Sequence, residues 1–342
     1  MRKGWEYKRW KEVLTIINGK NQSAVVDENG EYPIYGSGGI MGYANNWLCP
    51  ENCVIIGRKG NINKPIFVET KFWNVDTAFG LNANKEYLLP KFLYYFCLDY
   101  NFERHNKAVT IPSLTKVDLL KIDIPLPPKS TQLAIVSELD KINELIRLKK
   151  EQLKDFDNLA QSLFYEMFGD PVENEMGWNK MKWKDVLTII NGKNQSAVVD
   201  ENGDYPIYGS GGIMGYANNW LCPEKCTIIG RKGNINKPIF VESKFWNVDT
   251  AFGLKPNIEI LSPRFLFYFC LNYNFERHNK AVTIPSLTKA DLLKIDIPLP
   301  PLPLQRLFAQ RIEQIEREKS EVQKSIQDLE TLLASRMQYW FE

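Results

Sequence analysis

The chain has 342 residues, of which 44% are hydrophobic and 25% are charged, and its formal net charge is +2. This length allows two domains with cores of their own, and the composition excludes a disordered chain. The charge is unevenly placed, because residues 1–128 and 174–301 each carry +3 while the stretches that follow them are acidic. No apolar run approaches the roughly 18 residues that a membrane span needs, so no membrane partner is expected. No signal peptide precedes Trp5, which favours a cytoplasmic location.

The sequence contains the same unit twice, at a constant offset of 173 residues. Residues 13–30, 32–51, 55–69 and 101–116 recur without change at 186–203, 205–224, 228–242 and 274–289. A fixed offset predicts two copies of one architecture. The expected parts are a globular domain at 1–128, a helix at 129–169, a linker at 170–177, a second globular domain at 178–301 and a second helix at 302–342.

Each globular part begins with short strands and turns. Residues 13–17 predict a strand closed by a turn at 18–19, and Gly30 with Pro33 predicts a second turn. The stretch 35–43 reads YGSGGIMGY, and its glycines predict a flexible loop that lets the backbone approach a partner closely.

The rest of each globular part mixes strands, one helix and polar loops. In chain order the predictions are a strand at 53–56, a loop at 57–61, an edge strand at 65–68, a buried helix at 89–98 and a polar loop at 102–114. Ser113 is expected to cap a short helix at 114–120, which gives way to a strand-like stretch at 121–126. The prolines at 127–128 then end the domain.

A heptad pattern follows each proline exit. Steps of four and three from Gln132 to Phe168 give the first seam: Ile135, Leu139, Ile142, Ile146, Lys149, Leu153, Phe156, Ala160, Leu163 and Met167. The same steps give a second seam: Phe308, Ile312, Ile315, Lys319, Val322, Ile326, Leu329, Leu333, Arg336 and Trp340. Ten seam positions in each copy predict coiled-coil helices rather than an ordinary internal helix pair. A helix of some 37 residues is a rod of roughly 55 Å, the length of a spacer.

Two loops in each copy have the side chains of nucleic-acid contacts. In GRKGN at 57–61, two cations lie between glycines, which suits a phosphate or a guanine edge. The loop at 104–113 adds further cationic, amide and hydroxyl groups. Ordinary solvated loops are the alternative interpretation. The residues expected to contact DNA are Ser37, Arg58, Lys59, Asn61, Lys107, Thr110 and Ser113, with Ser210, Arg231, Lys232, Asn234, Lys280, Thr283 and Ser286 in the second copy.

Catalytic and metal-binding patterns are poor. Three cysteines per copy fit reduced thiols, and the pair Cys49 and Cys53 lacks the further ligands that zinc needs. Glu69 with Lys71 resembles the end of a nuclease motif, but no aspartate closely precedes it. His105 has no neighbouring nucleophile and orienting acid, so no triad is supported. No metal or catalytic residue is therefore expected.

The order of parts resembles a known family. Four segments occur in this order at 32–43, 55–62, 72–81 and 111–128, a heptad helix follows the last of them, and the whole series is present twice. This arrangement is similar to the specificity (S) subunit of Type I restriction-modification systems. The resemblance implies an α+β fold. Two globular α/β target recognition domains would be separated by two long helices packed as an antiparallel coiled coil, with pseudo-twofold symmetry.

The resemblance also implies a role and partners. Such a subunit is not an enzyme but binds double-stranded DNA, and it binds two modification (M) subunits that methylate adenine at N6. S-adenosylmethionine would belong to the M subunits, and ATP and Mg to restriction (R) subunits that can join, so no cofactor is expected in this chain.

Members of this family usually carry two different recognition domains, whereas here the two are nearly the same. A protein with twofold symmetry suits a DNA site with twofold symmetry, so we expect an interrupted palindrome as the target. The length of the two helices is expected to set the gap between the half-sites. Two alternatives stay open at this point: a DNA-acting enzyme that works alone, and a coiled-coil scaffold that reads no sequence.

Overall fold

The computed structural model describes residues 4–281 and 283–341, and these divide into two compact units. Residues up to Lys150 and from Lys324 onward form unit 1, and Glu151–Gln323 form unit 2. Each unit therefore combines one globular part with a segment of each long helix. The domain limits at 128, 169, 177 and 301 stay a prediction, because these units are compact bodies that cut across the helices.

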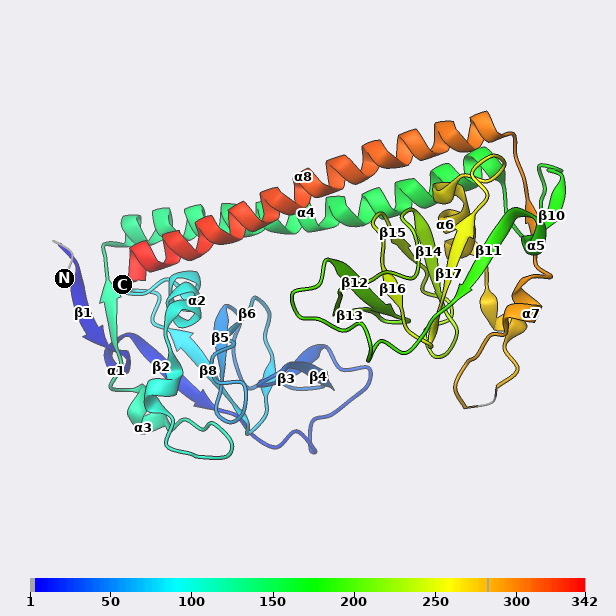
Figure 1. The fold of residues 1–342 in the computed structure, drawn as a ribbon. Helices are drawn as coiled ribbons and strands as arrows, with labels where there is room; N and C mark the ends of the chain where they lie inside the picture. Colours follow the sequence, from blue (N-terminus) through cyan, green and yellow to red (C-terminus); the bar gives the residue numbers. More distant parts are fainter. Residues whose placement is uncertain (1–3, 282, 342) are drawn as a thin grey trace. The chain divides into compact units, whose positions relative to one another are not determined.

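Unit 1 is built on a four-stranded antiparallel sheet (Figure 1). Its strands, in spatial order, are β2 (Leu14–Asn18), β8 (Ala78–Ala83), β5 (Cys53–Gly57) and β6 (Ile66–Val68). All of β5 is buried, because its alternate residues enter two cores. Val54 and Ile56 pack in the larger core with helix α2 (Pro90–Asp99), and Cys53 and Ile55 pack in a smaller core on the other face. The predicted strand, edge strand and buried helix are confirmed.

A second, smaller sheet overturns one prediction. Residues 35–43 are not a flexible loop but most of a hairpin, formed by β3 (Tyr32–Gly36) and β4 (Gly39–Ala44), with β7 (Trp73–Asn74) parallel to β3. The glycines conceal the alternation of a strand, and Gly39 closes the turn with a φ of 124°. Pro33 also lies in β3, so the predicted turn there ends earlier, where Gly30 N donates to Asp27 O at 2.9 Å.

The remaining elements of unit 1 flank these sheets. They are β1 (Glu6–Arg9), which pairs with β9 (Asp123–Leu126), the helices α1 (Trp10–Val13) and α3 (Lys116–Leu119), and the 3-10 turn η1 (Phe102–His105). Ser113 does not cap α3. Thr115 does, through a hydrogen bond of 3.2 Å from Asp118 N to its Oγ1. The helix begins later than predicted because the backbone of Ser113 is held in a bridge with Lys59.

Unit 2 repeats this architecture with the same strand orders. Its elements are β10 (Lys180–Lys182), α5 (Trp183–Val186), β11 (Leu187–Asn191), β12 (Tyr205–Gly209), β13 (Gly212–Ala217), β14 (Cys226–Gly230), β15 (Ile239–Val241), β16 (Trp246–Asn247), β17 (Ala251–Pro256), α6 (Pro263–Asn272), η2 (Phe275–His278), α7 (Lys289–Leu292) and β18 (Asp296–Pro298). Within the described residues, none of the helices is both long and apolar enough to cross a membrane.

The two long helices are α4 (Lys129–Phe168) and α8 (Leu302–Phe341). In unit 1, Glu138 pairs with Arg336, and Lys150 pairs with Glu330 at 2.7 Å. Partner numbers fall along α8 as they rise along α4, so the segments run antiparallel (Figure 1). In unit 2 the same direction follows from the ion pair of Asp157 with Lys319 and from the rings of Phe164 and Phe308, whose centroids lie 5.7 Å apart. The predicted α+β class and the antiparallel helix pairing are confirmed in each unit.

The helix seams differ in burial along their length. The buried seam positions are Ile135, Leu139, Ile142, Ile146, Ala160, Phe308, Ile312, Ile315, Val322 and Ile326, and the half-buried ones are Lys149, Leu153, Phe156, Leu163, Met167, Lys319, Leu329, Leu333, Arg336 and Trp340. Ile135 and Leu139 belong to the larger core of unit 1, and Phe308, Ile312 and Ile315 to that of unit 2. The first turns of each helix are thus part of a globular core as well as of a helix pair.

A buried glutamine fixes the start of each long helix. Gln132 Oε1 accepts from Leu89 N at 2.9 Å, and its Nε2 donates to Tyr87 O and Pro127 O, both at 2.9 Å. Gln305 makes the equivalent bonds in unit 2. Because every polar atom of this amide has a partner, the helix is held at one angle to its globular part.

Candidate nucleic-acid interface

The two loops predicted to contact nucleic acid are joined to each other through their main chains. Lys59 and Ser113 form an antiparallel bridge, Gly60 N donates to Pro112 O at 2.9 Å, and Leu114 N donates to Arg58 O at 2.9 Å. The same three connections recur in unit 2, at Lys232 with Ser286, Gly233 with Pro285 and Leu287 with Arg231. Residues far apart in sequence therefore form one continuous surface in each unit.

The tip of the β3–β4 hairpin lies against this pair of loops. A Cβ built on Gly60 would lie 3.7 Å from Ser37 Oγ, and one on Gly38 would lie 3.6 Å from Asn61 Nδ2. We call the three segments 37–38, 57–61 and 104–113 the recognition surface of unit 1. The recognition surface of unit 2 is 210–211, 230–234 and 277–286, in which Val282 lies outside the described residues.

All seven predicted contact residues of each unit lie on these surfaces, with different exposure. Exposed in unit 1 are Lys59, Asn61, Lys107 and Thr110, and half-buried are Ser37, Arg58 and Ser113. Exposed in unit 2 are Arg231, Lys232, Asn234, Lys280 and Thr283, and half-buried are Ser210 and Ser286. Whether these side chains touch bases or phosphates stays a prediction.

One arginine of each recognition surface, in the first loop, lies over an aromatic ring. The Arg58 guanidinium lies 5.7 Å from the centroid of the Phe79 ring, and its Nη1 makes a long hydrogen bond of 3.5 Å to Asp76 O. Arg231 lies 5.8 Å from the ring of Phe252 in the same way. A guanidinium held against a ring keeps a defined orientation, and its remaining N–H donors can meet a planar acceptor pair.

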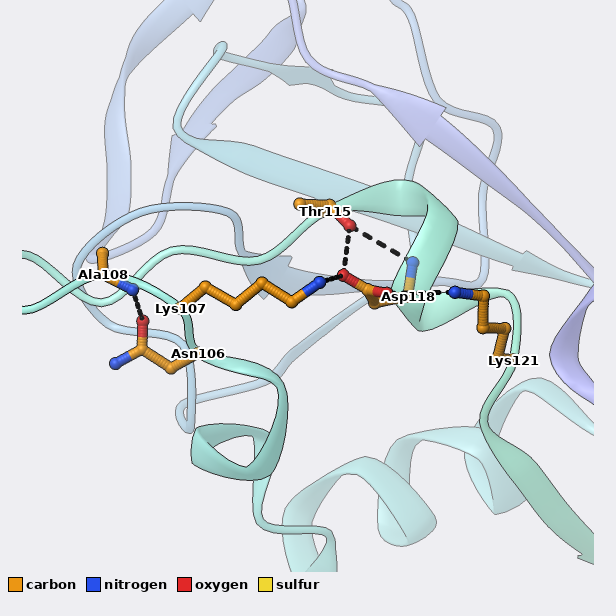
Figure 2. A network of polar contacts seen from close by, with 6 residues as sticks. All are labelled: Asn106, Lys107, Ala108, Thr115, Asp118 and Lys121. Carbon is orange, nitrogen blue, oxygen red and sulfur yellow. Dashed lines mark hydrogen bonds and ion pairs between the residues drawn. The ribbon is translucent and has the colours of Figure 1, made fainter.

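The lysine of the second loop is held by a carboxylate (Figure 2). Lys107 Nζ lies 2.6 Å from Asp118 Oδ2, which also accepts from Thr115 Oγ1 at 2.8 Å. Lys121 Nζ lies 3.2 Å from the other oxygen. Hydrogen bonds from Lys107, Thr115 and Lys121 hold the pKa of the Asp118 carboxyl well below its usual range. Lys107 is therefore a positioned cation that must exchange this carboxylate for any phosphate or base it binds.

Unit 2 repeats this pair. Lys280 Nζ lies 2.7 Å from Asp291 Oδ2, and hydrogen bonds from Lys280 and Thr288 lower the pKa of Asp291 to about 2. Both carboxylates are thus ionised at neutral pH. Their negative charge lies beside the recognition surface, where it opposes DNA binding.

Replacing Asp118 and Asp291 together by asparagine is expected to strengthen DNA binding. The change frees Lys107 and Lys280 on the recognition surfaces, and it also frees their neighbours Lys121 and Lys294. Each lysine that then engages a phosphate adds about −0.9 to the slope of log K against log salt. Binding measured between low and moderate salt checks both the affinity and the slope.

The matched control replaces Glu51 and Glu224, exposed carboxylates outside the recognition surfaces, by glutamine. This control removes the same charge without freeing Lys107 or Lys280. Equal gains in the two variants would contradict a specific role for the ion pairs.

Asn106 is a site residue that was not among the predicted contacts. Its Oδ1 accepts from Ala108 N and from Ser113 N, both at 3.0 Å, and its Nδ2 donates to Glu103 Oε2 at 3.1 Å. Asn106 therefore shapes the loop from within (Figure 2). An asparagine inside the polar run at 103–107, just before the apolar residues of the loop tip, is the available sequence signal for such a turn.

Other reactive side chains lie in the cores or pair within their own loop. All six cysteines are buried, and burial raises the pKa of Cys53 to about 12, which keeps its thiol protonated. His105 Nε2 lies 2.7 Å from Tyr100 OH. Among the described residues, there is no group of three or more His, Cys, Asp or Glu side chains that could hold a metal ion.

These observations define a class of protein, in which two equivalent α+β units, each with a basic surface made from loops, are built onto antiparallel helices. The chain belongs to the family described as the type I restriction modification DNA specificity domain, whose sequence model matches residues 2–155 and 175–331. The family resemblance of the sequence is therefore confirmed.

Relatives and solved structures agree with this assignment. The chain is 24% identical to a putative type I restriction enzyme specificity subunit, S.HindORF215P of Haemophilus influenzae, over 91% of this chain and 87% of the relative. It is also 24% identical to the MjaVIII specificity subunit of Methanocaldococcus jannaschii, over 96% and 92% of the two chains. The fold is similar to that of the S subunit from M. genitalium, with a TM-score of 0.67, 17% identity and coverage of 99% and 96%. A chain from a structural study of type I R-M complex assembly gives a TM-score of 0.63 at 19% identity, with coverage of 99% and 97%.

Proposed function

We propose that this chain is the specificity subunit of a type I restriction-modification system and that each recognition surface reads one half of a bipartite DNA target. The observation that carries the proposal is the joining of three loop segments into one basic surface, present in both units. DNA carries a phosphate charge on both flanks of its grooves, which suits loops with cations around polar side chains. The chain itself does no chemistry in this proposal.

Its partners would supply the reactions. Modification subunits, two per chain, would bring S-adenosylmethionine, and restriction subunits would bring ATP and Mg. Relatives named as specificity subunits of type I restriction enzymes support this division of labour.

The placement of the differences between the copies supports a palindromic target. The recognition surfaces are the same in sequence, whereas residues 82–99 differ from their equivalents at many positions, among them Leu89 with Ser262 and Lys91 with Arg264. Two of these positions contact the long helices. Leu89 N donates to Gln132 as Ser262 N does to Gln305, whereas Lys91 pairs with Asp140 at 2.9 Å and Arg264 pairs with Glu316 at 2.6 Å. The copies have diverged where each meets its own helix and have kept one reading surface, so both half-sites should carry the same bases.

Selection from random DNA with the full-length chain is expected to enrich an interrupted palindrome. The same motif should be found by mapping N6-methyladenine in cells that carry the chain with its modification subunits. An asymmetric motif would contradict the palindromic target, although it would leave the reading of a bipartite site intact.

Two further outcomes decide between classes of function. If no motif is enriched, the chain is a scaffold that reads no sequence. If the purified chain alone cuts or methylates plasmid DNA in the presence of Mg²⁺ or S-adenosylmethionine, it is an enzyme.

A further inference from the structure

The recognition surface of unit 1 presents two aliphatic side chains to solvent. Val109 is 102% exposed and Ile111 is 60% exposed, and Ile284, the equivalent of Ile111, is 59% exposed in unit 2. Burial of apolar area is favourable, so a chain has reason to turn such side chains inward where a loop allows it. Scattered exposed aliphatics are ordinary, so exposure alone decides nothing here.

The loop that carries these side chains is built to hold them outward. Asn106 Oδ1 binds the backbone N–H groups of Ala108 and Ser113, on both sides of the loop tip. The main chain of Pro112 is bound to Gly60, and Lys107 is fixed by Asp118. Because the loop is held at both ends, its tip stands away from the core, and the two aliphatic side chains lie exposed on the recognition surface.

The neighbours of these side chains indicate what they meet. Lys107 and Thr110 stand beside Val109 and Ile111, and Arg58 and Lys59 lie on the loop that is joined to theirs. These cations can contact the phosphates on the two sides of a DNA groove while the loop tip, with its polar and apolar side chains, enters the groove. In the major groove the one apolar group on the base edges is the C5-methyl of thymine, which aliphatic side chains contact.

We propose that Val109 and Ile111 in unit 1, and Ile284 in unit 2, read thymine through its C5-methyl group. The inference rests on the proposed function and adds to it a specificity contact, so that each half-site contains a thymine recognised by apolar contact. Hydrogen bonds from Lys107 or Thr110 would read its neighbours.

Replacing single thymines by deoxyuridine in the selected target tests the proposal, since this removes only the methyl group. With the full-length chain, loss of one contacted methyl should weaken binding about fourfold. In a variant with Val109→Ala, Ile111→Ala and Ile284→Ala, the same replacement should have no effect. The control is Val117→Ala, because Val117 is an exposed aliphatic residue outside the surface, and its equivalent is already Ala290.

The possible outcomes distinguish failure of the thymine contact from failure of the proposed specificity function. A selected motif that binds equally well with deoxyuridine, or loses the same affinity with the chain and the variant, overturns the methyl contact and leaves the specificity function standing. Failure to select any motif overturns both. The folding control is the midpoint temperature of thermal unfolding. An equal midpoint for the variant and the unchanged chain would show that the fold of the variant is intact.

Discussion

Replacing Arg58 and Arg231 together by alanine is expected to weaken specific DNA binding by about 2–6 kcal/mol, or roughly 30-fold at the lower end. Each arginine rests on a phenylalanine ring with N–H donors left for a partner, and a bidentate contact to guanine is worth about 1–3 kcal/mol. Selection with the variant should show one position relaxed in each half-site, at the same distance from the centre of the target.

Lysine at both positions is the matched control. It keeps the charge but loses the planar fork, so it should behave like alanine if the arginines read guanine. Recovery of affinity by lysine, together with an even loss across all sequences in the alanine variant, would instead assign Arg58 and Arg231 to phosphates. In that case the salt dependence of the alanine variant should also fall.

Phe164→Ala is expected to lower the free energy of unfolding of unit 2 by about 3–5 kcal/mol. The Phe164 ring is fully buried, with its centroid 5.7 Å from that of Phe265 on α6 and 5.7 Å from that of Phe308 on α8. Its removal leaves a cavity where both long helices meet the globular part. Urea unfolding followed by tryptophan fluorescence measures the loss.

Leu159→Ala provides the control, because Leu159 lies on the same helix and is 51% exposed. It should change the free energy of unfolding by less than about 0.5 kcal/mol. Equal losses in the two variants would mean that general helix propensity, rather than the aromatic packing of Phe164, governs the stability of this region.

The sequence predicts those elements of the fold whose pattern is local. Apolar runs predict β5 and α2, and heptads predict the two long helices α4 and α8. β8, the strand that pairs with both β2 and β5, was missed because Gly80 and Asn82 interrupt it and its residues are buried without alternation. The hairpin of β3 and β4 was missed because glycines replace the side chains that would alternate.

The seam shows a second limit. Steps of four and three select Leu163 and Met167, yet Phe164 and Phe168 are the fully buried residues at that end of α4. The helix there packs against α6 as well as against α8, so its buried face turns by one residue from the coiled-coil register. A heptad pattern describes contact with a helix and cannot include contact with a globular part.

The sequence identifies the loops of the recognition surface from their residue types, but it does not predict that the loops join to each other. Cations between glycines identify 57–61, and mixed polar side chains identify 104–113. Their joining depends on main-chain hydrogen bonds, which leave no mark on side-chain identity. The partner of Lys107 was also invisible, because Asp118 looks like an ordinary residue of a short helix until the loop is folded beside it.

The bridge between Lys59 and Ser113 uses backbone atoms alone. Residues other than proline can supply those atoms, so the bridge tolerates a change of side chain at Lys59 or Ser113. Asn106 and the glycines at 57 and 60 still have to stay, because they shape the two loops. New target preferences can therefore arise by point substitution, without rebuilding the domain and without weakening its attachment to the long helices. The chain carries two copies of the recognition surface, so a substitution in one copy alone would turn a symmetric target into an asymmetric one. A single mutation would then create a new DNA specificity.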